Sequence, residues 1–300
     1  MLDSLDRTIS LIAPAKINLA LHVTGLRDDG YHLLDSLVVF AAFGDRVSVK
    51  RAPVDSFDMS GPFGRKLPGD ESNLVLRARD ALRARFPKHT TPAVIHLEKH
   101  LPVASGIGGG SSDAAATLRA LTALWGIEAE PAQLAKIGLT LGADVPMCLQ
   151  GQPLFARGIG EDIERLATFP RLPMVLANNG VSISTPQVFA ALERRDNPAL
   201  PALPALSSIK DVCAYLTATD NHLFSATTKL IPAISETVGA LHQTAARFVR
   251  MSGSGGTCFA IYDSDSEAQT AATALKQSKP DWFVVATNSV MEGADLGPHR

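Results

Sequence analysis

The feature that most constrains this chain is a run rich in glycine and serine, Leu101–Asp113, which leads directly into an alanine-rich amphipathic segment. Glycine has no side chain to block the approach of a ligand to backbone N–H groups, and it adopts positive φ freely. A helix that follows such a loop points its free N–H groups and the positive end of its dipole back at the loop. The pattern therefore predicts a phosphate-binding loop at the start of a helix.

The common nucleotide-binding motifs do not match this run. No Gly-Lys pair precedes a serine or threonine, so the Walker pattern is absent. Counting from Gly106, the third glycine of a dinucleotide fingerprint would fall on Ser111, which disfavours an NAD(P)-dependent oxidoreductase. The protein-kinase triplets His-Arg-Asp and Asp-Phe-Gly are also missing. A flexible surface linker is the other interpretation, and the helical pattern that follows the loop argues against it.

Hydrophobic periodicity predicts the surrounding elements. Alternation over residues 17–23 predicts a strand that carries Lys16 and Asn18 on one face, opposite the core residues. A helix begins near Ser111 or Ser112, and a second helix opens at Pro131, with Asp144 just beyond its end. The other predicted elements before residue 100 are strands over 37–40 and 46–50 with a turn at Gly44-Asp45, a surface loop over 52–72, a helix over 73–86 and a strand over 93–97.

The C-terminal half has a different order of elements. It reads strand, helices, strand, strand, helix, strand, which suits a ferredoxin-like split βαβ sandwich. The predicted strands are 173–177, 248–251, 258–262 and 282–286, and the main helices are 231–246 and 266–275, with Asp196–Ser208 as a linker. Because 300 residues exceed the usual size of one core, we expect two domains, 1–169 and 170–300, with a boundary near Phe169–Arg171.

Composition excludes several classes of protein. The net charge of −2 gives no general basic field, so we expect no nucleic-acid partner. No apolar run is long enough for a membrane span, and the charged segment Met1–Ser10 does not resemble a signal peptide, so we expect no membrane partner. The three widely spaced cysteines favour neither a disulfide framework nor a zinc site. We therefore expect a cytoplasmic protein.

Three segments in order resemble the motifs of the GHMP small-molecule kinases, the family of galactokinase, homoserine kinase and mevalonate kinase. They are Ala13–Leu19, the glycine-rich loop, and Met251–Cys258. The resemblance implies a two-domain α+β fold, with an N-terminal domain like domain 2 of ribosomal protein S5 and a ferredoxin-like C-terminal domain. It implies a supporting third motif at Gly253, Ser254 and Gly255, and these ATP-binding residues: Pro102, Val103, Ala104, Ser105, Gly106, Ile107, Gly108, Gly109, Gly110, Ser111 and Ser112.

Other segments resemble the branch of the family whose acceptor is a cytidine diphosphate-linked methylerythritol. They are Arg27–His32, Leu141–Pro146, Gly158–Glu161, and Val181–Pro186 followed by Phe189. This resemblance implies transfer of the γ-phosphoryl group of ATP to the C2 hydroxyl of that small molecule, in non-mevalonate isoprenoid biosynthesis. One departure lies in the loop, where Ala104-Ser105 replaces the Gly-Ala of many members.

The same resemblance implies roles for individual residues. Asp144 orients the acceptor hydroxyl and takes its proton, and Lys16 stabilises the developing negative charge. The implied substrate-binding residues are Asn18, Tyr31, His32, Asp144, Thr185 and Phe189. The cofactors are ATP and Mg²⁺, and no dedicated metal site is visible: the ion travels with ATP, with Ser111 or Ser112 as a protein ligand. We expect a monomer or a weak homodimer.

Without the resemblance, the residues leave other interpretations open. Asp144 could cap the next element, Lys16 could be a solvated strand lysine, and Tyr31 and Phe189 could be ordinary half-buried aromatics. A homoserine or mevalonate-type kinase is the nearest alternative function, disfavoured because those acceptors carry no base to stack on Tyr31 and Phe189. A non-catalytic nucleotide-binding protein is the alternative from another class.

Overall fold

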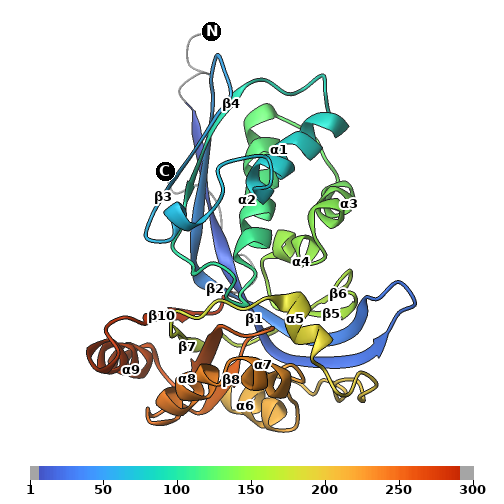
Figure 1. Cartoon of the computed structure of the whole chain (residues 1–300). Coiled ribbons are helices and arrows are strands. Elements are labelled where there is room, and N and C mark those ends of the chain that lie inside the picture. The colour runs from blue at the N-terminus through green and yellow to red at the C-terminus, as the bar shows by residue number, and fades with distance from the viewer. Residues whose placement is uncertain (1–6, 291–300) are drawn as a thin grey trace.

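The computed structural model describes residues 7–290, which form two β-sheets covered by helices (Figure 1). Residues 1–6 and 291–300 lie outside the described residues. They include the outer ends of the two expected domains and most of the segment Met1–Ser10. Within the described part, no helix is both long and apolar enough to cross a lipid bilayer.

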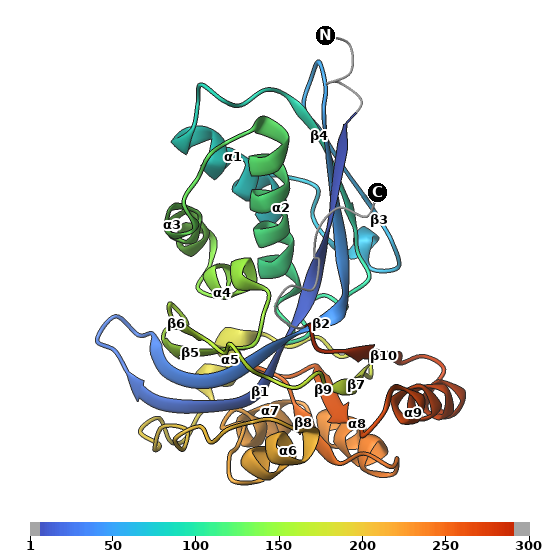
Figure 2. The same ribbon diagram turned by 180° about the vertical axis from the view of Figure 1, so that it is seen from behind.

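The first sheet is built on a long antiparallel hairpin of β1 (Thr8–Leu26) and β2 (His32–Arg51). On its other edge, β2 pairs with β4 (Ala93–Glu98) near its C-terminal end and with β5 (Leu154–Gly158) near its N-terminal end. Two short strands complete the sheet: β3 (Ser56–Ser60) lies parallel to β4, and β6 (Asp162–Arg165) lies antiparallel to β5. The hairpin (blue) reaches from the helical layer to the second sheet (Figure 2).

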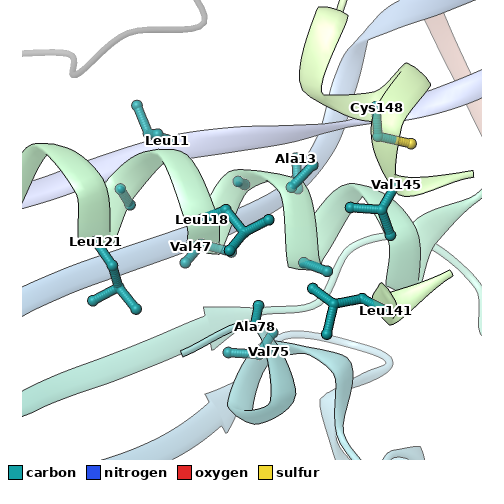
Figure 3. Packing of buried hydrophobic residues seen from close by; sticks show 14 of the residues in the cluster. Leu11, Ala13, Val47, Val75, Ala78, Leu118, Leu121, Leu141, Val145 and Cys148 are labelled. Carbon is teal, nitrogen blue, oxygen red and sulfur yellow. The ribbon is translucent and has the colours of Figure 1, made fainter. Parts of the chain in front are cut away.

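Four helices cover one face of the upper part of this sheet (Figure 1). They are α1 (Leu74–Arg85), α2 (Gly109–Trp125), α3 (Pro131–Leu141) and α4 (Val145–Gln150), and a 3₁₀ turn, η1 (Gly64–Lys66), precedes them. Helix α2 is buried almost all round, because Ala114, Ala115 and Ala116 let it lie close to its neighbours. Leu118 and Leu121 of α2 pack between the strands and the other helices (Figure 3).

The second sheet has the order β10-β7-β9-β8, with every pair antiparallel. Its strands are β7 (Pro173–Asn178), β8 (Phe248–Met251), β9 (Thr257–Ile261) and β10 (Phe283–Asn288). Helices α8 (Ala233–His242) and α9 (Asp265–Ser278) pack on this sheet, and α5 (Thr185–Ala190), α6 (Ile209–Thr217) and α7 (Phe224–Leu230) connect β7 to α8. This strand order is that of a ferredoxin-like sandwich, so the predicted α+β fold is confirmed.

The predicted turn at Gly44-Asp45 is wrong, because β2 continues through both residues, with an irregularity in its pairing to β1 between Phe40 and Gly44. Gly44 pairs with Pro14 of β1, and a Cβ at Gly44 would lie 2.1 Å from the carbonyl oxygen of Ala13. This glycine therefore serves the close approach of two strands and not a change of direction. The predicted loop over 52–72 also contains two regular elements, β3 and η1. Strand β3 is held by its pairing with β4.

Several boundaries also differ from the sequence-based expectation. Helix α2 begins at Gly109, one turn before Ser112, because Gly108 adopts a left-handed φ of 65° and starts the helix. Helix α8 covers only residues 233–242 of the predicted 231–246, since it begins after Pro232 and ends before the turn at residues 243–245 that leads toward β8. The short elements β5, β6, α6 and α7 were not predicted, although α6 is amphipathic and buries Val212, Tyr215 and Leu216 on one face.

Two stacked histidines join β1 to the segment before α7. The rings of His22 and His222 lie 4.1 Å apart at an interplanar angle of 20°. His22 Nε2 accepts from the backbone N–H of Asp220, and His222 Nδ1 accepts from that of Val23, so the observed bonds require neutral rings. Burial and the neighbouring His22 lower the pKa of His222.

This pair predicts that the folded state loses stability in mild acid. Because the pKa of His222 is lower in the folded chain than the ordinary value of about 6.5, the unfolded chain binds the proton more tightly. The stabilisation is complete above pH 6.5 and declines as the pH falls below it. Urea unfolding at pH 7.5 and pH 5.5 should show a lower midpoint at pH 5.5. His222→Asn, which keeps an acceptor near Nδ1, should reduce that difference, and an unchanged difference would exclude His222 as its source.

Candidate active site

The phosphate loop lies between the end of β4 and the start of α2, and it contacts β1 at Lys16. The backbone N–H of Lys16 donates to the carbonyl oxygen of Ile107 at 2.9 Å. A Cβ at Gly108, where φ is 65°, would lie 3.1 Å from Lys16 Cβ. Since the first helical hydrogen bond joins Ser112 N–H to Gly108, the N–H groups of Gly109, Gly110 and Ser111 have no intrahelical partner. These groups can hold an anion.

Ala104 has a left-handed backbone conformation within this loop. Its φ of 52° is the only positive value for a residue other than glycine among the described residues. Alanine in that conformation costs roughly 1–2 kcal/mol more than glycine. The carbonyl oxygen of Ala104 accepts from Ile183 N–H at 3.0 Å, which ties the loop to the segment before α5. This is the position where the sequence departs from the glycine of many GHMP kinases.

A second glycine-rich loop, Ser252–Gly256, packs backbone to backbone against the phosphate loop. Thr257 N–H donates to the carbonyl oxygen of Ser105 at 2.9 Å. A Cβ at Gly106 would lie 2.2 Å from Gly255 O, and a Cβ at Gly256 would lie 2.8 Å from Ser105 Cα. No side chain fits between the two loops, so the third motif fixes the shape of the phosphate loop by direct contact.

Lys16 and Asp144 meet in the cleft that these loops border. Lys16 Nζ donates to Asp144 Oδ2 at 2.7 Å, although 128 residues separate them in the chain. The lysine is 6% exposed and the Asp144 side chain is 39% exposed. Lys16 is therefore not the solvated strand lysine that its pattern alone suggests. Asp144 immediately precedes α4, where it is open to a ligand in the cleft.

Asn18 presents an unpaired acceptor to the same cleft. Its Nδ2 donates to Ser36 Oγ at 2.8 Å, and its backbone N–H donates to Ser252 Oγ at 3.1 Å. Its Oδ1 is buried and has no hydrogen-bond partner. A buried acceptor without a partner costs free energy, so Asn18 Oδ1 is suited to receive a hydrogen bond from a ligand hydroxyl.

The aromatic residues expected to bind a base are only partly assembled. His32 packs against Phe189 with ring centroids 4.8 Å apart and a tilt of 34° between the rings, and Phe189 lines the cleft. Burial and the nearby Arg195 lower the pKa of His32, and both His32 Nε2 and Arg195 Nε are buried without partners. Tyr31 is 56% exposed near the tip of the β1–β2 hairpin and does not line the cleft.

The cleft has a volume of about 460 Å³ and both apolar and polar residues in its lining. Leu67, Pro68 and Leu74 line it together with Asn73, whose side chain caps α1, and Leu74 lies next to Gly110. The predicted site residues that line the cleft are Lys16, Asn18, Pro102, Val103, Ala104, Ser105, Gly106, Gly108, Gly109, Gly110, Ser111, Asp144, Thr185, Phe189, Gly253 and Ser254.

Five predicted site residues lie elsewhere, two of them being Tyr31 and His32. Ile107 is fully buried in the core between the two sheets. Ser112 is buried, and its hydroxyl donates to the carbonyl oxygen of Pro14 at 2.7 Å, so this hydroxyl hydrogen is engaged inside the fold. Gly255 lies behind the cleft, where a Cβ would lie 2.7 Å from Thr227 Cγ2. Of the two adjacent serines, Ser111 alone lines the cleft.

Sequence reasoning missed a buried charged cluster at the root of the phosphate loop. Lys99 Nζ donates to Asp45 and, at 2.7 Å, to Asp113 Oδ2, and no side chain of the three is more than 3% exposed. The two carboxylates hold the pKa of Lys99 above its ordinary value despite burial, while burial raises the pKa of Asp113. Lys99 and Asp113 line the cleft. No local pattern announces the cluster, because its members belong to β2, the end of β4 and α2.

Other chemistry is not supported by the described residues. Among residues 7–290, no group of three His, Cys, Asp or Glu side chains could hold a metal ion. Cys148 lies beside Ser112, but burial raises the pKa of its thiol to about 12, so it is not a nucleophile at neutral pH.

Comparisons with known proteins agree with this geometry. The family model for the GHMP kinases N-terminal domain matches residues 73–152, and the model for the GHMP kinases C-terminal domain matches residues 199–281. The chain is 52% identical over 286 residues to a 4-diphosphocytidyl-2-C-methyl-D-erythritol kinase of Brucella abortus, covering 94% of this chain and 95% of the relative. It is 51% identical to the protein of that name from Mesorhizobium japonicum, covering 94% and 96%.

Solved structures are similar over almost the whole chain. A crystal structure of 4-(cytidine 5'-diphospho)-2C-methyl-D-erythritol kinase superposes with a TM-score of 0.75 at 34% identity, covering 93% of this chain and 98% of the other. Homoserine kinase from Cytophaga hutchinsonii superposes with a TM-score of 0.68 at 20% identity, covering 95% of each chain. The second likeness supports the fold alone.

Proposed function

Because the chain belongs to the GHMP kinase family, we propose that it transfers the γ-phosphoryl group of ATP to the C2 hydroxyl of 4-diphosphocytidyl-2-C-methyl-D-erythritol. The products are ADP and the 2-phosphate of the acceptor. The 2-phosphate is the product that continues non-mevalonate isoprenoid biosynthesis. The observation that carries this proposal is the 2.7 Å contact of Lys16 with Asp144, in a cleft that also exposes the free N–H groups of the phosphate loop.

The catalytic pair acts on the acceptor hydroxyl. Asp144 Oδ accepts the proton of the C2 hydroxyl, and the oxygen attacks the γ-phosphorus of ATP as the bond to the β-phosphate oxygen breaks. Lys16 Nζ lies within hydrogen-bond distance of Asp144 and stabilises the negative charge that develops on the attacking oxygen and the transferred group. Asn18 Oδ1 is free to orient an acceptor hydroxyl.

The donor nucleotide follows the shape of the cleft. Its phosphates lie against the N–H groups of Gly109, Gly110 and Ser111, and its base contacts apolar lining residues such as Leu67 and Pro68. Mg²⁺ suits the available donors: it prefers few protein oxygens with phosphate and water, and Ser111 supplies a hydroxyl at the cleft. When bound, the ion neutralises the triphosphate charge.

The cytidine end of the acceptor lies toward Phe189 and His32. Phe189, against which His32 packs at a tilt, offers an aromatic surface to the cytosine, and Thr185, which shares a 2.7 Å hydrogen bond with Ser254, closes that side of the cleft. Tyr31 does not line the cleft, so the base contacts rest on Phe189 and the His32 ring packed against it.

Phe189→Ala should raise the KM for the cytidyl acceptor by about tenfold, because stacking of a base on an aromatic ring contributes roughly 1–3 kcal/mol. The KM for ATP should stay within about twofold. Steady-state kinetics with each substrate varied in turn measures both values. Phe248→Ala is the matched control, since that ring packs on Phe259 away from the cleft. Equal changes in both KM values would contradict a role for Phe189 in base recognition.

A coupled assay of ADP release tests the proposed reaction. Purified protein with ATP and Mg²⁺ should turn over the cytidyl acceptor and neither homoserine nor mevalonate. Turnover with a rival acceptor alone would retain a GHMP kinase and reject the proposed substrate. ATP binding without turnover of any acceptor would favour a non-catalytic nucleotide-binding protein.

The remaining assignments are part of the same proposal. We propose domains 1–169 and 170–300, since the first sheet ends at Arg165 and the second begins at Pro173. A cytoplasmic location fits three cysteines that are all free. A monomer or weak homodimer without nucleic-acid or membrane partners remains our expectation, and light scattering tests the oligomeric state.

A further inference from the structure

The cluster of Asp45, Lys99 and Asp113 contacts both ends of the phosphate loop. Asp45 Oδ1 accepts from the backbone N–H groups of His100 and Leu101, at 2.6 and 2.8 Å, and so fixes the segment that enters the loop. Lys99 Nζ then joins Asp45 to Asp113 in the second turn of α2, which leaves the loop. Residues 102–108 are therefore held between two anchored points.

The cluster also lies directly against the ligand-binding part of the helix. A Cβ on Gly109, the first residue of α2, would lie 3.0 Å from Lys99 Nζ and 3.7 Å from Asp45 Oδ2. Lys99 and Asp113 line the cleft, and Asp113 Oδ1 is buried without a hydrogen-bond partner. A small displacement of Lys99 would thus move the N–H groups that we assign to the phosphates.

Neither a gain in folding stability nor electrostatic attraction for a nucleotide explains the presence of this cluster beside the phosphate loop. Apolar side chains of similar volume are often as stabilising as a buried ion pair, because the charges lose their hydration. Lys99 Nζ is already paired with Asp45 and Asp113, so the cluster offers a nucleotide no unpaired positive charge. The cluster instead supplies directional hydrogen bonds. These bonds hold β2, the end of β4 and α2 in one relative position.

We propose that Asp45, Lys99 and Asp113 form a positioning triad that sets the geometry of the phosphate loop and thereby the affinity for ATP. The triad touches no reacting atom. This inference rests on the proposed function, since it takes the loop as the site of the ATP phosphates.

The test compares Asp113→Ala, which removes the acceptor of Lys99, with Asp113→Asn, which keeps an oxygen in its place. We expect Asp113→Ala to raise the KM for ATP and the Kd for ADP by about tenfold, the effect of losing one hydrogen bond to a charged group. The KM for the cytidyl acceptor should stay within about twofold. Asp113→Asn should stay within about threefold of the wild type for every value.

Two further variants separate positioning from loss of stability. Asp55→Ala removes the two-bond ion pair with Arg83 on the far side of α1, so it should lower the melting temperature and leave both KM values unchanged. Asp113→Leu fills the buried space without an acceptor, and should reproduce the rise in KM for ATP if Asp113→Ala does not fold.

The outcomes are distinct. Normal or tighter ADP binding in Asp113→Ala or Asp113→Leu would reject the triad as a positioning device and leave the kinase assignment intact. An equal loss in Asp113→Asn would likewise reject positioning through the Lys99 hydrogen bond. Failure of the wild-type protein to bind ADP would instead overturn the proposed function itself.

Discussion

Replacing Asp144 by Asn should abolish phosphoryl transfer while ADP still binds. In the wild type, Lys16 Nζ lies 2.7 Å from the Asp144 carboxylate. The amide of Asn keeps the size of the side chain and an oxygen that accepts from Lys16, but it cannot take the proton of the acceptor. Loss of a general base reduces kcat by roughly 10²–10⁴-fold. Lys16→Met should reduce kcat by at least about 10²-fold, because it removes a fixed positive charge from the site.

The two residues act as one unit, so their effects should not add. The double variant Lys16→Met with Asp144→Asn should be about as slow as the slower single variant. Lys279→Met is the matched control, because Lys279 at the end of α9 donates to Glu236 of α8 at the same 2.7 Å distance, outside the cleft. Pre-steady-state measurement of ADP formation separates chemistry from product release. A value of kcat for Asp144→Asn above a tenth of the wild type would remove Asp144 from the role of base.

The parts of the site that follow local patterns could be predicted from the sequence. The glycine-rich run before the alanine-rich helix predicts a phosphate loop from local sequence alone. Alternation around Lys16 likewise predicts a strand. Periodicity reports which face of an element is buried and says nothing about its partner. The contact of Lys16 with Asp144 spans 128 residues, so only the resemblance to a family could bring them together before the structure did.

The failures have a common physical cause, which is the override of local preference by tertiary contacts. Gly44-Asp45 reads as a turn, yet Gly44 is required by the nearby strand backbone and Asp45 by the Lys99 cluster. A tertiary contact also engages Ser112, whose hydroxyl donates to Pro14 inside the fold. Ala104 accepts a conformation that suits glycine because bonds on both sides of the loop hold it there.

Gly106→Ala should be the most damaging methyl group that can be added to the phosphate loop. The residue has a φ of 73°, and the new Cβ would lie 2.2 Å from the carbonyl oxygen of Gly255 and 2.8 Å from that of Ser252. Both obstacles are backbone atoms, so no side chain can rotate away to relieve the contact. Strain in the left-handed region costs roughly 1–2 kcal/mol, and forced displacement of packed atoms roughly 1–3 kcal/mol more.

Gly126→Ala isolates the contact between the loops from the cost of backbone strain. Gly126 has a similar φ of 64° at the end of α2, but a Cβ there would meet nothing within 4 Å. Its unfolding free energy should fall by only about 1–2 kcal/mol, with normal ADP affinity. Gly106→Ala should lose more stability and most of its ADP affinity, because separating the loops tilts the N–H groups that hold phosphate. Equal losses in the two variants would mean that backbone strain alone requires glycine at Gly106, and that the third motif does not shape the phosphate loop through this contact.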